Sequence, residues 1–296
     1  MTNQRNTPLP PGATIGILGG GQLGRMAALS AARLGYRCHI FSPDADAPAK
    51  EVSAAQTTAP YEDKHAARAF ARAVDVVTFE FENVPDETLA AIGEIVDVRP
   101  GVEALHVSQD RAIEKTFLAN HGIGTAPWAP MTSADELAAA KATGFPAILK
   151  TARFGYDGKG QVRVETGDGL EAAWAKIDNA PAVLEGFVDF EREISVIVAR
   201  GVDGNTRSYT PVDNVHRDHI LYTTTAPSTI DTALAGTARE ISERIATALG
   251  LVGLLAVEMF VTQGGEILVN EIAPRPHNSG HWTMDACAVS QFEQFI

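Results

Sequence analysis

Cysteine is scarce in this 296-residue chain: the two cysteines, Cys38 and Cys287, are far apart and outside any CxxC arrangement. The sequence therefore predicts neither a disulfide framework nor a cysteine-based zinc site. Runs of about 18 or more apolar residues are also absent, and the polar, proline-rich start lacks a signal-peptide core. These absences predict no membrane span and favour a cytoplasmic protein.

Basic residues are outnumbered, since 24 Lys and Arg stand against 37 Asp and Glu and give a formal net charge of −13. No block rich in Lys or Arg occurs, whereas a surface that binds nucleic acid usually needs a basic face. Nucleic acid is therefore not an expected partner. On such an acidic background, a local cluster of cations indicates a site for an anionic ligand.

Strand and helix patterns alternate over the first third of the chain. The strands are short and apolar, the helices are amphipathic, and polar or glycine-containing segments separate them. This alternation predicts a doubly wound parallel α/β domain, to which we assign residues 1–108. The expected elements are strands at 14–18, 36–43 and 75–81 and helices at 22–34 and 63–74.

Two units of α+β character follow. Residues 109–190 are predicted to form a linker helix and a small lid domain, in which SADE (Ser133 to Glu136) matches a capping box for a helix that ends at Gly144. Residues 191–296 are predicted to form a larger domain with a mixed sheet and a closing hairpin. The chain ends in SQFEQFI, which has helical spacing and no stop signal, so we expect this domain to be incomplete.

The segment GGGQLG (Gly19 to Gly24) matches GxGxxG between a predicted strand and a predicted helix, and Asp44 follows about twenty residues later. This pattern fits a dinucleotide site, because glycines let a pyrophosphate approach a helix N-terminus. Two other interpretations fit as well: a tight turn that has no ligand, or a turn that holds a phosphate or sugar of some other ligand. GxGxxG alone does not decide among them.

The segment RFGYDGKG (Arg153 to Gly160) combines three glycines with two cations and lacks the GK[ST] of a P-loop. Its glycines let backbone N–H groups approach anionic oxygens, and Lys150, at the end of the preceding strand, adds a third cation. A plain hairpin turn at Asp157 and Gly158 is the alternative, but it does not explain the three cations. The cluster favours a bound polyphosphate.

Two glutamates of the closing hairpin are predicted to face each other. If Gly264 and Gly265 form a two-residue turn, Glu258 lies directly opposite Glu271, with Cβ atoms about 5 Å apart. Two bare carboxylates at that distance repel by about 3 kcal/mol at an effective dielectric constant near 20. A shared Mg²⁺ or Mn²⁺ would turn the repulsion into attraction. Solvated glutamates on an edge strand, or a longer turn that breaks the register, are the alternatives.

The segment APRPHNSGHW (Ala273 to Trp282) follows the hairpin directly, and its prolines and Gly280 exclude a regular helix. Several donors in a rigid turn suit a small oxyanion such as a carboxylate or carbonate, although a structural turn with satisfied polar groups fits equally well. Glu193 opens a predicted strand and could accept from ribose hydroxyls or be ordinary surface.

Together these segments resemble the ATP-grasp superfamily and, within it, the family of 5-(carboxyamino)imidazole ribonucleotide synthases of purine biosynthesis. The resemblance runs from about Thr14 to the last residue. It implies that an ATP-grasp fold, with a small lid domain and a larger domain, follows the first domain, and it counts against NAD at GGGQLG. The segments that carry it are GILGGGQLGRM, TFEFENVP, TARFGYDGKGQ, EGFVDFEREIS, DNVHRDHIL and NEIAPRPHNSGHWT.

The resemblance implies an ADP-forming ligase. ATP would phosphorylate bicarbonate to carboxyphosphate, and this intermediate, or the CO₂ that it releases, would carboxylate the exocyclic amine of 5-aminoimidazole ribonucleotide. The implied partners are these small molecules, the implied cofactors are ATP and Mg²⁺ (or Mn²⁺), and the implied assembly is a homodimer. The glycine-rich loop would close over nucleotide and substrate and exclude water from a hydrolysable intermediate.

The resemblance also assigns the site, motif by motif. The residues expected to contact ATP are Arg111, Lys150, Gly155, Tyr156, Asp157, Gly158, Lys159, Gly160, Gln161, Glu185, Gly186, Phe187, Val188, Glu193, His216, Asn270 and Glu271. Glu258 and Glu271 would hold the metal, with Asn270 alongside. The catalytic residues would be Arg275, His277, Asn278, Tyr156 and Asp157. The ribonucleotide would meet Gln22, Leu23, Glu80, Tyr156, Asp157, Arg275 and His277.

Members of this family continue beyond the position of Ile296 with basic residues that are expected to hold the substrate phosphate. The main alternative is another ATP-grasp ligase, such as a formate-using glycinamide ribonucleotide transformylase or a biotin-carboxylase-like enzyme. A nucleotide-binding module without turnover is an alternative of a different class, and a Rossmann oxidoreductase is the third.

Overall fold

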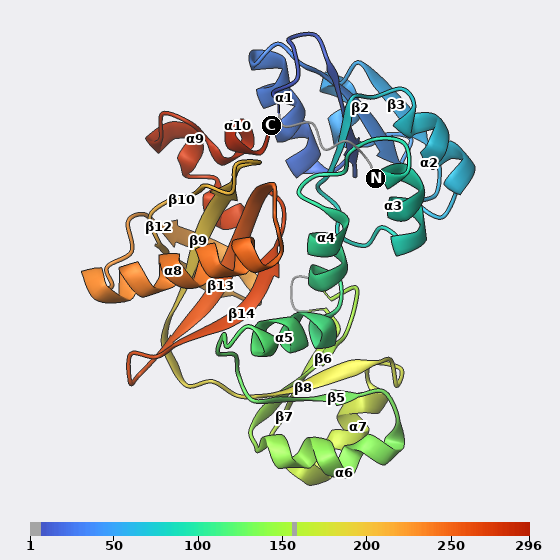
Figure 1. Cartoon of the computed structure of the whole chain (residues 1–296). Helices are drawn as coiled ribbons and strands as arrows, with labels where there is room; N and C mark the ends of the chain where they lie inside the picture. Colours follow the sequence, from blue (N-terminus) through green and yellow to red (C-terminus); the bar gives the residue numbers. More distant parts are fainter. Residues whose placement is uncertain (1–6, 156–158) are drawn as a thin grey trace.

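Three sheets organise the protein, and each is formed by one of the three predicted segments (Figure 1). The computed structural model describes residues 7–155 and 159–296. Within these ranges, no helix has the length and apolar character that crossing a membrane requires. The proposed boundaries after residues 108 and 190 stay predictions, although the long strand of the third sheet begins at Phe190.

The first sheet is parallel, with strand order β3-β2-β1-β4. Its central strand is buried on both faces, as expected for a parallel sheet covered by helices. Leu18 pairs with Phe79, so the carboxyl ends of β1 and β4 meet at one edge. The elements are β1 (Thr14–Leu18), α1 (Gln22–Arg33), β2 (Arg37–Ser42), β3 (Ala55–Thr58), α2 (Lys64–Ala71), β4 (Val76–Phe79), α3 (Asp86–Gly93) and α4 (Val102–Ser108).

The second sheet is antiparallel, with strand order β5-β8-β6-β7, and belongs to the small domain. Figure 1 shows α6 and α7 together at the far end of this domain and α5 between it and the rest of the molecule. The elements are α5 (Arg111–Asn120), β5 (Trp128–Met131), α6 (Leu137–Ala140), β6 (Ala147–Thr151), β7 (Gln161–Val164), α7 (Leu170–Ala175) and β8 (Ala182–Gly186).

The capping box predicted at SADE is wrong. The Ser133 side chain caps no backbone amide, and the Glu136 carboxylate accepts from the amide and hydroxyl of Thr132. The expected helix is reduced to the four residues of α6, with a 3₁₀ turn on each side, at Ala134–Glu136 and Lys141–Thr143. Further 3₁₀ turns lie at Pro48–Val52, Gly167–Gly169 and Asn278–Gly280.

The third sheet has the order β12-β11-β9-β13-β14, and β10 pairs with β9. Every pair of its named strands is antiparallel, so the mixed character predicted for this sheet is limited to one parallel bridge, Thr125 to Val269. Leu255, Val257 and Met259 are buried beneath α8 in the largest apolar core. The elements are β9 (Phe190–Arg200), β10 (Thr206–Ser208), β11 (Val212–Arg217), β12 (Ile220–Thr225), α8 (Thr232–Ala248), β13 (Gly253–Thr262) and β14 (Ile267–Ala273).

The β13–β14 hairpin confirms that Glu258 lies opposite Glu271, but the predicted two-residue turn is wrong. The amide of Thr262 donates to the Glu266 carbonyl at 2.9 Å, so three residues form the loop and the register moves by one. A β-bulge after Glu258, at Asn270 of the partner strand, moves the register back. The two irregularities cancel, and the glutamates meet as expected.

The last helices return to the first domain. In Figure 1, α10 (Gln291–Phe295) lies beside α1, whereas α9 (Thr283–Ala286) precedes it at the third sheet. Phe292 belongs to the buried cluster that contains Ile15 and Ala28 of the first domain. Gln291 is fully buried, and its side-chain amide accepts from the His277 amide and donates to the His277 carbonyl. This packing fixes the turn after β14 against the first domain.

Gly280 should be intolerant of substitution because of this packing. A Cβ at Gly280 would lie 2.2 Å from Ile197 Cδ1 and 2.3 Å from Gln291 Oε1. We expect Gly280→Ala to lower the free energy of unfolding by about 1–3 kcal/mol, measured by urea unfolding. The control is Gly236→Ala in α8, where a Cβ meets nothing within 4 Å, and this change should raise stability by up to about 1 kcal/mol. Equal effects of the two substitutions would contradict this account.

Candidate functional site

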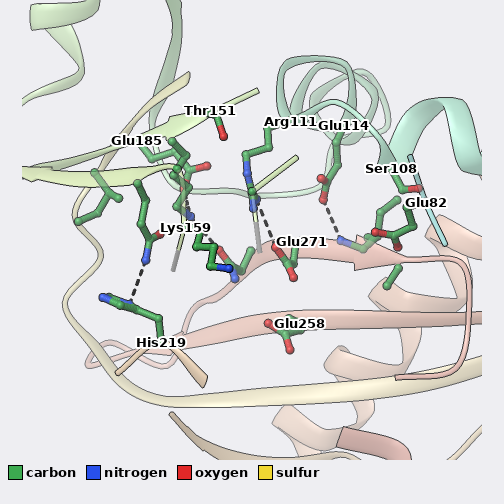
Figure 2. Close-up of a pocket in the computed structure, with 18 of the residues that line it drawn as sticks. Glu82, Ser108, Arg111, Glu114, Thr151, Lys159, Glu185, His219, Glu258 and Glu271 are labelled. Carbon is green, nitrogen blue, oxygen red and sulfur yellow. Dashed lines mark hydrogen bonds and ion pairs between the residues drawn. The ribbon is translucent and has the colours of Figure 1, made fainter. Parts of the chain in front are cut away.

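A cavity of about 780 Å³ lies where the three units meet, and most of the predicted site residues line it (Figure 2). Gln22, at the exposed start of α1, is not among the lining residues. Tyr156, Asp157 and Gly158 lie outside the residues that the structure describes. The predicted residues that line the cavity are Leu23, Glu80, Arg111, Lys150, Gly155, Lys159, Gly160, Gln161, Glu185, Gly186, Phe187, Val188, Glu193, His216, Glu258, Asn270, Glu271, Arg275, His277 and Asn278.

Glu258 and Glu271 sit on neighbouring strands at the cavity wall (Figure 2). Arg111 donates to Glu271 Oε2 at 3.2 Å, and His277 Nε2 lies 3.4 Å from Glu258 Oε1. Burial and the charge of Glu271 raise the pKa of Glu258 to about 7. Burial would also raise the pKa of Glu271, but the cations Arg111 and Lys150 outweigh it and lower this pKa. Glu271 is therefore ionised at neutral pH, whereas Glu258 is only partly ionised, and a bound cation would favour its ionised form.

The β-bulge brings Asn270 to the same part of the cavity. Regular alternation would have turned its side chain to the face opposite Glu271, and the extra residue in the strand removes that restriction. Asn270 Oδ1 lies 3.4 Å from Lys150 Nζ, and the Asn270 side chain also hydrogen-bonds to Glu258. Two carboxylates and an amide oxygen are ligands that suit a hard dication. No group of three or more His, Cys, Asp and Glu gathers at a point within the described ranges, so water or ligand oxygens would complete the coordination.

Glu185 holds the side chain of Lys150, which was predicted to contact ATP. Lys150 Nζ donates to Glu185 Oε2 at 2.8 Å, and Lys115 Nζ lies 3.1 Å from Glu185 Oε1. Burial would raise the pKa of Glu185, but the two ammonium groups outweigh it and lower this pKa to about 2. The Glu185 carboxylate is therefore engaged by two lysines, and the adjacent segment from Gly186 to Val188 lines the cavity beside it.

A second acid–base pair lies on β9 and β11. His216 Nδ1 is 2.6 Å from Glu193 Oε2, and this hydrogen bond raises the pKa of His216. Across the cavity mouth, the Gln161 side chain contacts His219 Nδ1 at 2.9 Å, which joins the small domain to the β11–β12 turn. Glu193, His216 and Gln161 therefore border the same end of the cavity, as their assignment to one nucleotide requires.

The turn after β14 gathers three polar side chains at the other end. Arg275 pairs with Glu82 through Nε and Oε1, which are 3.1 Å apart. Burial and the charge of Arg275 lower the pKa of His277 to about 3, so its imidazole is neutral at physiological pH. His277 Nδ1 also contacts Ser279 Oγ at 2.9 Å. With the exposed amide of Asn278, the turn offers one permanent cation and two neutral polar groups, an arrangement that suits a small oxyanion.

The GGGQLG turn encloses a carboxylate of the protein itself. Glu80 Oε1 accepts from the Gly21 amide at 2.6 Å, at the N-terminus of α1. Gly19 has φ of +108°, and a Cβ there would lie 2.5 Å from Glu80 Oε1. This oxygen therefore lies where a dinucleotide pyrophosphate would bind. The dinucleotide interpretation of this turn is wrong.

Sequence reasoning missed several charged residues of the site. Lys115 and Glu114 follow Arg111 at helical spacings of four and three, so a charged face on α5 was the available signal. Glu114 Oε1 accepts from the Ile272 amide at 2.8 Å, next to Glu271, and burial together with the Glu271 charge raises its pKa to about 8. Glu82 and Gln291 gave no such signal, because their partners come from distant loops.

Comparisons with known proteins agree with this geometry. Residues 12–109 match the ribonucleotide synthetase preATP-grasp domain, and residues 116–292 match the ATP-grasp domain. The chain is 51% identical over 293 residues to the N5-carboxyaminoimidazole ribonucleotide synthase of Brucella melitensis, a match that covers 98% of this chain and 81% of that protein.

Two crystal structures add the ligands that relatives hold. An N5-carboxyaminoimidazole ribonucleotide synthetase in complex with ADP is 41% identical, with a TM-score of 0.92 over 97% of this chain and 76% of that one. The enzyme of Aspergillus clavatus, in complex with ADP and 5-aminoimidazole ribonucleotide, is 32% identical, with a TM-score of 0.88 over 96% of this chain and 75% of that one. These matches cover nearly the whole chain, and they show that it belongs to the N5-carboxyaminoimidazole ribonucleotide synthase family of ATP-grasp ligases.

Proposed function

We propose that this protein uses ATP and bicarbonate to carboxylate the exocyclic amine of 5-aminoimidazole ribonucleotide, which gives N5-carboxyaminoimidazole ribonucleotide, ADP and phosphate. The observation that carries the proposal is the single cavity that holds Lys150, the Glu258–Glu271 pair and the Arg275 turn together. Membership of the family and the ligands of its crystallised relatives support the same reaction.

In the first step, a bicarbonate oxygen attacks the γ-phosphorus of ATP and ADP leaves. Lys150 and Arg111 balance phosphate charge, while Glu193 and His216 orient the nucleoside. Arg275, His277 and Asn278 orient the bicarbonate beside the γ-phosphate. In the second step, the substrate amine attacks the carbon of carboxyphosphate and the bond from this carbon to the phosphate oxygen breaks, or that bond breaks first and the amine attacks the CO₂ released. On either route the products are the carbamate and phosphate, and the phosphate takes up the proton that the amine loses. Arg275 offsets the negative charge that develops on the carboxyl oxygens.

We further propose that the dication is Mg²⁺, held by Glu258 and Glu271 with Asn270 alongside. When bound, it would neutralise charge on the phosphate oxygens during phosphoryl transfer. Leu23 and Glu80 of the first domain would face the ribonucleotide, together with Gln22, Tyr156 and Asp157. The loop from Gly155 to Gln161 would cover the phosphates. A homodimer and a cytoplasmic location complete the proposal, and both rest on composition and family resemblance.

Substrate omission tests this function against the other ATP-grasp ligases. We expect phosphate release from ATP to require both bicarbonate and 5-aminoimidazole ribonucleotide. Formate should not replace bicarbonate, and biotin should not replace the ribonucleotide. Phosphate release that formate supports with glycinamide ribonucleotide, or that biotin supports with bicarbonate, would assign another acceptor. ATP binding without turnover, under any combination of substrates, would indicate a binding module.

Glu271→Gln should reduce phosphate release by about a hundredfold or more, because it removes a charged metal ligand and the partner of Arg111. The measurement is the rate of phosphate release at saturating Mg²⁺ and ATP. The matched control is Glu266→Gln, on the same hairpin but exposed at its far end, which should retain the wild-type rate. A similar rate for both variants would rule out a dication at this pair.

The affinity for Mg²⁺ should depend on pH through Glu258. Its pKa is raised to about 7, so the carboxyl is largely protonated at pH 6 and largely ionised at pH 8. Only the ionised form binds a metal well, so the half-saturating Mg²⁺ concentration should fall by about tenfold from pH 6 to pH 8. The nucleotide and Glu114 also titrate in this range, and Glu258→Gln is the control that retains these contributions and loses that of Glu258. Equal pH dependences in the wild type and the variant would contradict the prediction.

A further inference from the structure

Lys115 is a buried cation that the reaction described above does not use. Its ammonium lies 3.1 Å from Glu185 Oε1, with side-chain exposures of 2% and 5%, and the other Glu185 oxygen accepts from Lys150 at 2.8 Å. Lys150 lines the cavity, whereas Lys115 is not among the lining residues. The three groups therefore form a chain of alternating charges that runs from α5, through β8, to the cavity surface on β6.

The number of charges in this chain decides what a ligand in the cavity meets. A carboxylate paired with Lys150 alone would cancel its positive charge. With Lys115 as the second cation, two positive charges and one negative charge leave a net charge of +1, and each buried group still has a partner. Lys115 thus offsets Glu185 and leaves the charge of Lys150 available to the cavity.

The direction of the Lys150 ammonium is also fixed. An ammonium has three donor hydrogens, and two acceptors are already placed around this one: Glu185 Oε2 at 2.8 Å and Asn270 Oδ1 at 3.4 Å. The third hydrogen remains for an anionic oxygen in the cavity. Movement of Glu185 would let the Lys150 ammonium turn. Lys115 restrains Glu185 through Oε1, the oxygen that Lys150 does not contact.

Helix α5 supplies one cation to each of two glutamates that line the cavity. Arg111 lies one turn before Lys115 and reaches Glu271, whereas Lys115 reaches Glu185. Like charges at this spacing repel on a helix, and each is compensated by a glutamate of a different sheet. A buried ion pair is by itself weak evidence for a stabilising role, so the placement beside Lys150 indicates a role in the site.

We propose that Lys115 is a positioning residue for the nucleotide phosphates: acting through Glu185, it orients the Lys150 ammonium and keeps its charge available. This inference rests on the proposed use of ATP. The removal of Lys115 should therefore weaken the binding of ATP and leave the binding of bicarbonate and of the ribonucleotide largely unchanged.

The first test compares Lys115→Met, which removes the charge at similar length, with Lys115→Arg, which keeps it. We expect Lys115→Met to raise the KM for ATP by about tenfold or more, with smaller changes in kcat and in the KM values of bicarbonate and ribonucleotide. Lys115→Arg should recover most of the ATP affinity. Lys176→Met, at an exposed position on the small domain, controls for the loss of a lysine and should leave the KM for ATP unchanged.

A double-mutant cycle then asks whether Lys115 acts through Glu185. The affinity for ADP with Mg²⁺ is measured by calorimetry for the wild type, Lys115→Met, Glu185→Gln and the double variant. Because Glu185 is the proposed route, loss of Lys115 should cost little further affinity once the charge of Glu185 is absent. Calorimetry does not need turnover, so this result separates a failure of the positioning role from a failure of the proposed reaction.

Two outcomes would overturn the proposal. One is a folded Lys115→Met protein with a lowered melting temperature but an affinity for ATP within about twofold of the wild type, which would make Lys115 structural. The other is full additivity in the cycle, which would mean that Lys115 does not act through Glu185. If Lys115→Met does not fold, Lys115→Gln takes its place in both experiments, with the same expected and contradicting results.

Discussion

Glu258 and Glu271 face each other across β13 and β14, and two full charges about 5 Å apart would repel by about 3 kcal/mol at an effective dielectric constant near 20. The elements around them offset this repulsion. Arg111 of α5 meets Glu271, His277 of the turn after β14 lies against Glu258, and the Lys150 charge lowers the pKa of Glu271. Contacts from α5, β6 and that turn therefore keep the two carboxylates together at the cavity wall.

The hairpin shows how much local sequence can establish. The opposition of the two glutamates was predicted correctly, yet from a turn that the chain does not form. Counting outward from Gly264 and Gly265 assumes a regular ladder, and the longer loop and the bulge at Asn270 break it in opposite senses. The burial of Val257 and Met259 on the opposite face is the more robust constraint, because a net slip of one residue would turn the carboxylates from the cavity into the apolar core.

Periodicity was sufficient for β1, β2 and β4 of the parallel sheet, for α8 and for the long strands, because each buries a continuous apolar stripe. It missed β3, in which no residue is buried. It failed at the alanine-rich segment before Gly144, because this segment has too little apolar surface to stabilise a long helix. Within the site, Lys115 could have been found from the charged face of α5. Glu82 could not, since its partner, Arg275, is brought to it by the docking of the first domain onto the third sheet. Contacts of that kind depend on tertiary structure, and no local pattern encodes them.

Glu80 and Glu82 also show that a local motif does not identify the partner that tertiary structure brings to it. Both follow the end of β4: Glu80 accepts from the glycine turn, whereas Glu82 pairs with Arg275. A glycine turn at a helix N-terminus attracts any anion, so the motif does not distinguish a ligand phosphate from a carboxylate 59 residues further along the chain. Glu80 is hydrogen-bonded within the first domain, whereas Glu82 joins that domain to the turn after β14. The burial of Phe292 against the same domain adds a second contact, and because residues of the first domain line the cavity, the cavity is complete only when this domain is docked.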